Sequence, residues 1–146
     1  MERIYFKIEI DAPKEKVWDI LLGETSYPKW TAVFAEGSRA ITDWQAGSKV
    51  FFVNAEGDGM ASKIAEHMPN EYISIQHLGF YKNGVEDYES EEAKKWGDVF
   101  ENYKLSTKDG KSLLSVEMDT NEEYKSYFEE KWPLALEKVK ELAEEA

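Results

Sequence analysis

The sequence contains no cysteine, which excludes disulfides and thiolate metal sites. It contains only two arginines, and its net charge is -12. Phosphate binding depends on clustered basic side chains, so this charge balance argues against nucleic acid and against anionic membrane surfaces. No run of about 18 apolar residues is present, so we expect no insertion into a membrane. The first residues lack the pattern of a signal peptide, and the expected location is therefore cytoplasmic.

What the chain does contain is a high proportion of charged and aromatic side chains, at 33% and 14% of its residues. Such a composition is typical of a soluble globular domain with an aromatic-rich interior, and not of a disordered chain. The length of 146 residues corresponds to a single domain. We found no internal repeat and no linker that would divide residues 1–146.

The segment 121–146 has the strongest helical pattern in the sequence. At about 100° per residue, one apolar stripe is formed by Tyr124, Phe128, Trp132, Ala135, Val139 and Leu142. Asn121 is a candidate N-cap, because its side chain can accept a bond from the first turn. Pro133 lies inside the segment and predicts a bend there or the start of a second helical segment. A helix with three bulky aromatics on one face needs a large concave partner.

The preceding 120 residues predict mostly strands. Residues 2–11 alternate as a half-buried strand, and a short helix follows, with Asp11 as a possible cap and Pro13 in its first turn. Tyr27 and Trp30 lie in a loop or a second short helix. Further strands are predicted at 33–43 (with a bulge at Gly37), 49–54, 60–67, 71–80, 99–107 and 112–119. A polar segment separates the fourth and fifth of these.

Strands joined by turns favour an antiparallel sheet, and its apolar face must be covered. The C-terminal helix is the only predicted element with enough area to cover it. The sequence therefore predicts an α+β fold in which a curved antiparallel sheet of about six or seven strands wraps around a long C-terminal helix. Two short helices would follow the first strand.

Several motifs in this order resemble a known superfamily. They are I-D-A-P-x-x-x-V-W-x-x-L at 10–21, W-x-A-G-S at 44–48, the strand at 59–66 with Pro69 behind it, and the closing helix. Together they are similar to the START-like, or Bet v 1-like (SRPBCC), helix-grip superfamily, in its branch of activator of Hsp90 ATPase homologs. The resemblance covers essentially the whole chain, which departs from it at Gly47-Ser48 and in the acidic stretch 81–97. It implies a cavity between sheet and helix that in relatives holds apolar or amphipathic small molecules.

The sequence has two histidines, His67 and His77. The turn at 69–70 pairs position 67 with about 72, which leaves His77 roughly 17 Å away along the strand, too far to share a metal ion. We expect His67 to be exposed near the turn. His77 has the parity of buried isoleucines, which favours a hydrogen-bonded core histidine over a group that faces a ligand or transfers a proton.

Glu101 shares a strand face with Val99, Tyr103 and Leu105. A carboxylate on a concave face must be paired, protonated or hydrated, and Arg39 is a candidate partner. Two interpretations are open. Glu101 is either solvated at the rim of the sheet, or it joins His77, Tyr103 and Arg39 as a polar anchor in an apolar pocket.

Aromatic side chains could form the wall of that pocket, although aromatics at such spacings are more often plain core. In a helix-grip fold the two interpretations overlap. Together with the polar anchors, the candidate ligand-binding residues are Trp18, Trp30, Phe52, His77, Glu101, Tyr103, Tyr124, Phe128, Trp132 and Arg39. Phe80 is a further candidate for the wall. No Ser-His-Asp arrangement, phosphate loop or calcium loop is readable, so we expect no catalytic residue, metal or cofactor.

Three functions from different classes follow. The first is binding of a hydrophobic or amphipathic small molecule between the sheet and the C-terminal helix, without catalysis. The second, suggested by the name of the resembling branch, is a co-chaperone-like interaction with a protein partner such as a chaperone, and a broad exposed apolar patch would support it. The third is a cyclase, dehydratase or hydrolase using Glu101 or His77, which requires ionisable groups with opposed pKa shifts.

Overall fold

The computed structural model describes residues 1–145 and has the predicted order of a strand, two short helices, further strands and one long helix. Its elements are β1 (Glu2–Ile10), α1 (Lys14–Leu22), α2 (Tyr27–Thr31), β2 (Arg39–Ile41), β3 (Lys49–Val53), β4 (Gly59–Met68), β5 (Tyr72–Lys82), β6 (Val85–Asp87), α3 (Glu91–Lys95), β7 (Val99–Lys108), β8 (Lys111–Thr120) and α4 (Glu122–Glu144). The α+β class and the long C-terminal helix are confirmed.

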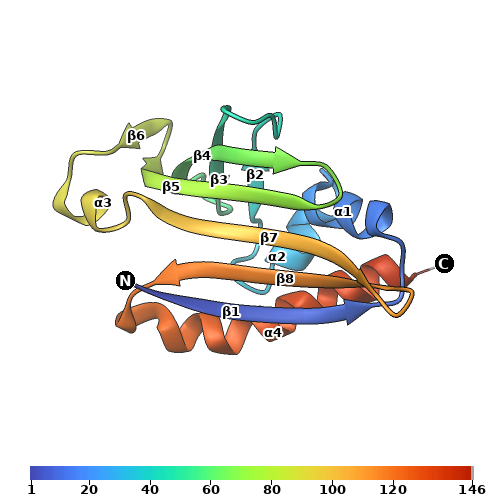
Figure 1. Ribbon diagram of the computed structural model, residues 1–146. Coiled ribbons are helices and arrows are strands. Elements are labelled where there is room, and N and C mark those ends of the chain that lie inside the picture. Colours follow the sequence, from blue (N-terminus) through green and yellow to red (C-terminus); the bar gives the residue numbers. More distant parts are fainter. Residues whose placement is uncertain (146) are drawn as a thin grey trace.

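All strands belong to one antiparallel sheet with the order β1-β8-β7-β5-β4-β3-β2, and β6 pairs with β5 beside this path. Figure 1 shows α4 running alongside β1 and β8, with α1 at one end of the sheet and with β6 and α3 at the other. Hairpins connect β3 to β4, β4 to β5, and β7 to β8. The β7–β8 turn uses Asp109 and Gly110, whose φ angles of 50° and 79° fit a two-residue turn that requires positive φ.

The helix α4 begins after Asn121, whose side chain accepts a 3.0 Å hydrogen bond from the backbone N–H of Tyr124. This N-cap was predicted. Of the two alternatives predicted at Pro133, a bend or a second segment, the second segment was wrong, because α4 is one helix from Glu122 to Glu144. Pro133 itself is exposed, while its neighbour Trp132 is buried. The packing of Trp132 and of the following apolar turns holds the helix together across the proline.

Three local predictions differ from the structure. Asp11 does not cap α1; Pro13 takes the N-cap position, without a side-chain bond. The strand predicted at 33–43 is reduced to Arg39–Ile41, and Gly37, with φ of 75°, lies in a turn instead of a bulge. The reason is tertiary: Phe34 packs on α4, with its ring centroid 4.9 Å from that of Trp132, which the alternation pattern could not show. The polar segment contains β6 and α3.

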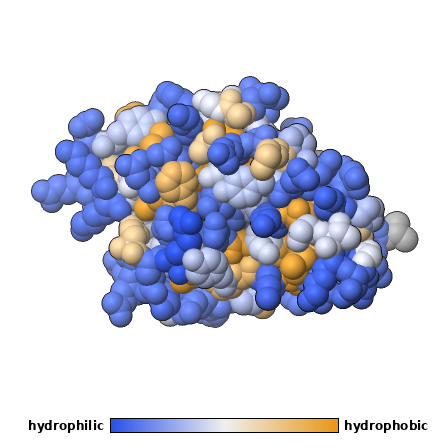
Figure 2. Space-filling view, in the orientation of Figure 1, coloured by the Kyte–Doolittle hydropathy of each residue, from blue (hydrophilic) through white to orange (hydrophobic). Residues whose placement is uncertain are grey.

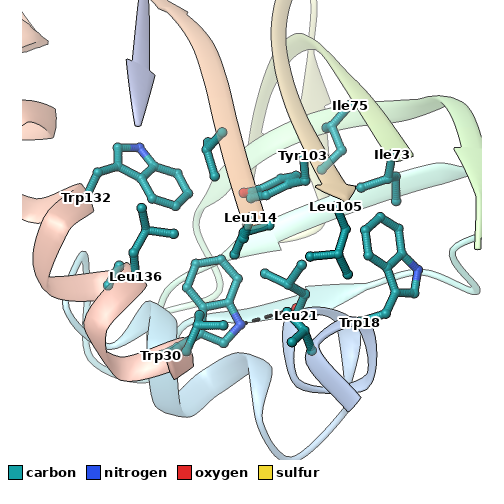
Figure 3. Packing of buried hydrophobic residues seen from close by; sticks show 14 of the residues in the cluster. Trp18, Leu21, Trp30, Ile73, Ile75, Tyr103, Leu105, Leu114, Trp132 and Leu136 are labelled. Atoms are coloured by element: carbon teal, nitrogen blue, oxygen red, sulfur yellow. Dashed lines mark hydrogen bonds between the residues drawn. The ribbon is translucent and has the colours of Figure 1, made fainter. Parts of the chain in front are cut away.

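The hydrophobic core lies between the concave face of the sheet and the helices α1, α2 and α4. Figure 3 shows Trp132 and Leu136 of α4, Trp30 of α2 and Tyr103 of β7 gathered in one layer. The face seen in Figure 2 is mainly hydrophilic, with hydrophobic residues visible in separate small areas. Within residues 1–145, no helix has the length and apolar character needed to cross a membrane.

Candidate functional site

A partly open cavity of about 450 Å³ lies between the N-terminal half of α4, the α2 region and the sheet. Its wall is mostly apolar and aromatic. The lining residues include Tyr27, Trp30, Phe34, Phe52, Met60, Phe80, Trp96, Val99, Met118, Tyr124, Phe128 and Trp132. Its polar lining includes Arg39, Asp58, His77, Glu101, Tyr103 and Asp119. A cavity of this size and character is typical of a small-molecule site.

The apolar wall is built where two helices meet the sheet. Trp30 of α2 and Trp132 of α4 approach each other at 6.0 Å between ring centroids, and each also packs against Tyr103 of β7. The indole N–H of Trp30 donates to the backbone carbonyl of Leu21, as the dashed line in Figure 3 shows, and that of Trp132 contacts the sulfur of Met118. Because both indoles have partners inside the protein, they offer apolar surface to the cavity.

One compact hydrogen-bonded group interrupts this wall. The Nε2 of His77 lies 3.0 Å from Oε1 of Glu101, and the hydroxyl of Tyr103 donates to Oε2 of the same carboxylate. Behind the histidine, the Oγ of Ser62 lies 2.7 Å from its Nδ1. We call these four residues the Glu101 cluster. Its carboxylate side chain is 17% exposed and faces the cavity, whereas Ser62 is fully buried behind it.

The register of the sheet determines which residues meet in the Glu101 cluster. Ser62 of β4 is opposite His77 of β5, and Glu101 of β7 is opposite Ile75. Glu101 and His77 are therefore diagonal neighbours on adjacent strands, a position from which long side chains reach each other. Tyr103 lies two residues after Glu101, so both side chains are on the same face of β7. Three adjacent strands thus bring the four polar groups together.

Charge in the cluster is concentrated on the carboxylate. Burial pushes the pKa of Glu101 upward, but the hydrogen bond and positive charge of His77 and the hydroxyl of Tyr103 outweigh it, and the net pKa lies below the ordinary value. Glu101 is therefore ionised at neutral pH. With a carboxylate on Oε1, His77 donates its Nε2 proton to Glu101, while its Nδ1 contacts the Oγ of Ser62.

Two tyrosines stay neutral beside this charge. Burial, followed by the negative charge of Glu101, raises the pKa of Tyr103 and of Tyr27 well above the usual value for a phenol. Tyr27 belongs to α2 and also lines the cavity. Both phenols therefore remain protonated over the whole physiological range of pH.

Further charged residues on the cavity wall have different surroundings. Asp119 is held by Arg3, with 2.9 Å between Oδ1 and Nε, and it also accepts the backbone N–H of Phe100. Burial alone would raise the pKa of Asp119, and the Arg3 guanidinium brings the net value below normal. Arg39, on the edge strand β2, is exposed to solvent.

Nine of the ten residues predicted to bind ligand lie on the cavity wall, and Trp18 does not. Trp18 faces the other end of the core, where its indole N–H donates to Nε2 of His67 over 3.1 Å. The same contact corrects the prediction for His67, which is partly buried and also hydrogen-bonded through Nδ1 to the carbonyl of Trp44. A helical pattern shows that Trp18 is buried without showing at which end of the core.

The predicted pairing of Glu101 with Arg39 was wrong, because the partners of Glu101 are His77 and Tyr103. Three strands, β3, β4 and β5, separate Arg39 on β2 from Glu101 on β7. Glu101 is not a solvated rim residue either, since its side chain is mostly buried. His77 is the hydrogen-bonded core histidine that was favoured: it is buried and hydrogen-bonded at both nitrogens, and it also lines the cavity.

Sequence reasoning missed Tyr27, Phe34 and Trp96 on the wall and Ser62 in the cluster. Tyr27 was placed in a loop or short helix, Phe34 lay in the strand wrongly predicted at 33–43, and Trp96 lay in the polar segment between two predicted strands. Only Ser62 had a detectable signal, because the β4–β5 hairpin places it opposite His77. Two irregularities in that hairpin, at Ala61/Ser62 and Ile64/Glu66, displace the simple register count.

The chain does contain a Ser-His-Glu series, which no linear pattern revealed, but its order is unsuited to a serine nucleophile. Ser62 is 2% exposed and lies behind His77, outside the cavity wall. A nucleophile must reach its substrate, and here Glu101, but not Ser62, lines the cavity. Among residues 1–145 no cluster of three or more possible metal-ligating side chains occurs.

Comparisons with known proteins give matches in structure and none in sequence. No protein-family model matches the sequence, and no curated protein sequence matches it. Among solved structures, the Aha1 dimer of Colwellia psychrerythraea matches with a TM-score of 0.73 and 20% identity, over 99% of this chain and 97% of that one. Protein CV1439 of Chromobacterium violaceum matches over 100% of both chains, with a TM-score of 0.69 and 18% identity.

CalU16 of Micromonospora echinospora matches with a TM-score of 0.67 and 17% identity, over 97% of this chain and 76% of that one. Likeness at such identities establishes architecture and leaves function open. The likeness confirms the predicted architecture, an antiparallel sheet wrapped around a long C-terminal helix. The chain has a helix-grip fold with an aromatic-lined cavity, which the mostly buried carboxylate of Glu101 faces.

Proposed function

We propose that this protein binds a largely apolar, amphipathic small molecule in the cavity between the sheet and α4. The observation that carries the proposal is the combination of an aromatic wall around about 450 Å³ with a single compact polar cluster at Glu101. Apolar area supplies the affinity of such sites, and a few placed polar groups orient the ligand. The helix-grip fold of the solved neighbours is consistent with this use of the space.

The ionisation states favour binding over catalysis. A general acid or base works best when its pKa lies near the working pH. The pKa of Glu101 is lowered, and those of Tyr27 and Tyr103 are raised, so all three move away from neutrality. Each group is then held in one protonation state, which suits a fixed hydrogen-bonding site.

A co-chaperone-like role has one observation in its favour, the match to a protein whose structure is described as an Aha1 dimer. A protein-docking surface would be supported by a broad apolar patch. The exposed large hydrophobic residues are instead distributed over separate elements, for example Tyr5 on β1, Ile41 on β2 and Leu134 on α4. Ligand binding therefore remains the preferred function.

The test is to block the cavity without disturbing the core. Ala35 is exposed and lines the cavity, so Ala35→Trp adds bulk there while leaving the buried layers intact. Ala46→Trp makes the same change at an exposed position outside the wall and serves as the control. The readouts are native mass spectrometry of the purified proteins and titration with the fluorescent probe N-phenyl-1-naphthylamine.

We expect the wild type and Ala46→Trp to bind the probe with equal affinity, and Ala35→Trp to bind it at least tenfold more weakly. A small molecule that co-purifies with the wild type should be lost from Ala35→Trp alone. If the wild type neither retains a molecule nor binds the probe, the cavity is not a ligand site, and the protein-interaction function becomes the better candidate.

A further inference from the structure

The Glu101 cluster presents far more hydrogen-bond acceptors than donors to the cavity. An ionised carboxylate has about four acceptor positions. His77 occupies one on Oε1 and Tyr103 occupies one on Oε2, which leaves acceptor capacity on a side chain that lines the cavity. The single hydroxyl proton of Tyr103 is used on Glu101, so towards the cavity this oxygen can only accept. His77 likewise donates its Nε2 proton to Glu101.

Tyr27 is the remaining polar group beside the cluster. Its phenol lines the cavity, is close enough to Glu101 to be influenced by its charge, and makes no hydrogen bond within residues 1–145. No buried side-chain polar atom in that part of the chain lacks a partner, so the Tyr27 hydroxyl has access to the cavity. It provides one donor against the several acceptor positions of Glu101 and Tyr103.

The other charges around the cavity do not reverse this balance. Asp58 and Asp119 add negative charge to the wall, and Asp119 is already neutralised by Arg3. The positive side chain of Arg39 is on the exposed edge strand β2, and three strands separate β2 from β7, which carries Glu101. Beside the cluster, the ligand therefore meets the ionised carboxylate of Glu101 and a set of hydrogen-bond acceptors.

We propose that the Glu101 cluster is a selectivity site for ligands that carry a hydrogen-bond donor, a hydroxyl or an amine, on an aromatic body, and that it rejects ligands ending in a carboxylate. The inference rests on the proposed function, which it makes more specific. A donor satisfies the free acceptor positions of Glu101, whereas a ligand carboxylate would lie against a buried like charge. The rings around the cluster, including Phe52 at 5.8 Å from His77, suit a planar aromatic body.

A matched set of tricyclic probes tests this in the wild-type protein. Fluorene measures the apolar contribution alone, 2-hydroxyfluorene and 2-aminofluorene add a donor, 2-methoxyfluorene adds an oxygen that can only accept, and fluorene-2-carboxylate adds a negative charge. Each is titrated at pH 7.5 by quenching of tryptophan fluorescence and checked by calorimetry. We expect 2-hydroxyfluorene to bind about tenfold more tightly than 2-methoxyfluorene, and the carboxylate to bind about tenfold more weakly than fluorene.

The variant Glu101→Gln tests whether the Glu101 cluster causes the order of affinities among the probes. The amide keeps the size of the side chain but has no charge, so the preference for hydroxyl over methoxy should fall to about threefold and the penalty on the carboxylate should largely disappear. Glu66→Gln, at an exposed position on β4, is the control and should keep the wild-type ranking. Circular dichroism checks that both variants fold. If either does not, the order of affinities of the probes for the wild-type protein still tests the proposal.

The outcomes separate the two proposals. If fluorene binds, but the hydroxy and methoxy forms bind equally or the carboxylate binds most tightly, the donor selectivity is wrong and the ligand-binding function survives. Loss of carboxylate binding in Arg39→Gln would then assign anion recognition to the edge strand. If no member of the series and no N-phenyl-1-naphthylamine binds, the proposed function and this inference both fail.

Discussion

At the scale of single residues, Glu101 shows how surroundings determine a chemical role. Its strand parity indicated a concave-face carboxylate, and the choice between a solvated rim and a paired interior group was open. Contacts from His77 and Tyr103 decided it, because they satisfy both carboxylate oxygens and keep the group charged. A buried charge without such partners would be too costly to retain.

The lowered pKa of Glu101 predicts a pH-dependent stability difference between the wild type and Glu101→Gln. A carboxyl whose folded pKa lies below its unfolded value of about 4.3 stabilises the fold above that pH, and the contribution is lost as pH falls through the folded pKa. The free energy of unfolding of wild type minus variant should therefore be constant above about pH 5 and decrease on acidification. Urea unfolding between pH 7 and pH 3.5 measures it. An increase of the difference at low pH would mean that burial dominates and the folded pKa is raised.

Ser62 is predicted to stabilise the protein through His77. Ser62→Ala removes the 2.7 Å partner of Nδ1 and leaves a buried ring nitrogen unsatisfied, which costs about 1–3 kcal/mol. Urea unfolding at pH 7.5 gives the free energy. Ser106→Ala on the outward face of β7, where the side chain is half-buried, should stay within about 0.5 kcal/mol of the wild type. Equal effects of the two substitutions would show that the contact of Ser62 with His77 does not stabilise the protein.

At the scale of elements, α4 serves both the core and the cavity. Its C-terminal half buries Ala135, Leu136, Val139 and Ala143 in the core, while Tyr124, Phe128 and Trp132 of its N-terminal half line the cavity. Trp132 lies where the two functions meet. One helix can do both because its apolar stripe is continuous, whereas the sheet leaves space only beside the first part of the helix.

Truncating Trp132 should therefore cost much more than truncating its exposed neighbour Leu134. Trp132 is 3% exposed and contacts aromatic rings from β1, α2 and β7, so Trp132→Ala should lower the free energy of unfolding by about 3–5 kcal/mol. Leu134 is 54% exposed, and Leu134→Ala should change the free energy of unfolding by less than about 0.5 kcal/mol. Chemical denaturation measures both. Similar losses would show that the helix is not anchored at Trp132.

At the scale of the whole molecule, the net charge of -12 is the dominant long-range feature. Few of the acids are neutralised at the surface: ion pairs such as Lys49–Glu86 and Lys125–Glu2 join exposed side chains and contribute little. Self-repulsion among the remaining acids opposes the compact state. The fold tolerates it because the apolar layers between sheet and helices are continuous.

Screening this repulsion should stabilise the protein. Raising NaCl from 0.02 to about 0.5 M shortens the Debye length to a few Å, and the thermal midpoint should rise by several degrees. A triple variant with Glu36→Lys, Glu56→Lys and Glu89→Lys, all at exposed positions, changes the net charge from -12 to -6 and should respond about half as strongly. Differential scanning calorimetry compares the two proteins. A midpoint that falls with salt would mean that favourable ion pairs outweigh the repulsion.

Periodicity and turn chemistry were enough to predict the architecture. The alternation of β1, the Asp109-Gly110 turn and the apolar stripe of α4 are local patterns, and local backbone preferences act on them directly. The α+β class and the helix-grip arrangement followed, since a sheet with one apolar face and one long amphipathic helix have few ways to bury their surfaces. Nine of the ten residues that these patterns suggested for the site lie on the cavity wall.

Only the tertiary structure decided how those residues are paired. The bulges of β4, the strand order β7-β5-β4 and the position of β2 at the sheet edge determine that Glu101 contacts His77 and not Arg39. Which end of the core receives Trp18, and where Tyr27 and Phe34 pack, likewise depend on contacts between segments distant in the sequence. A one-dimensional pattern reports which face a side chain occupies. Its partners across the sheet are determined by register and layer packing, which arise only when all strands and helices bury their apolar faces together.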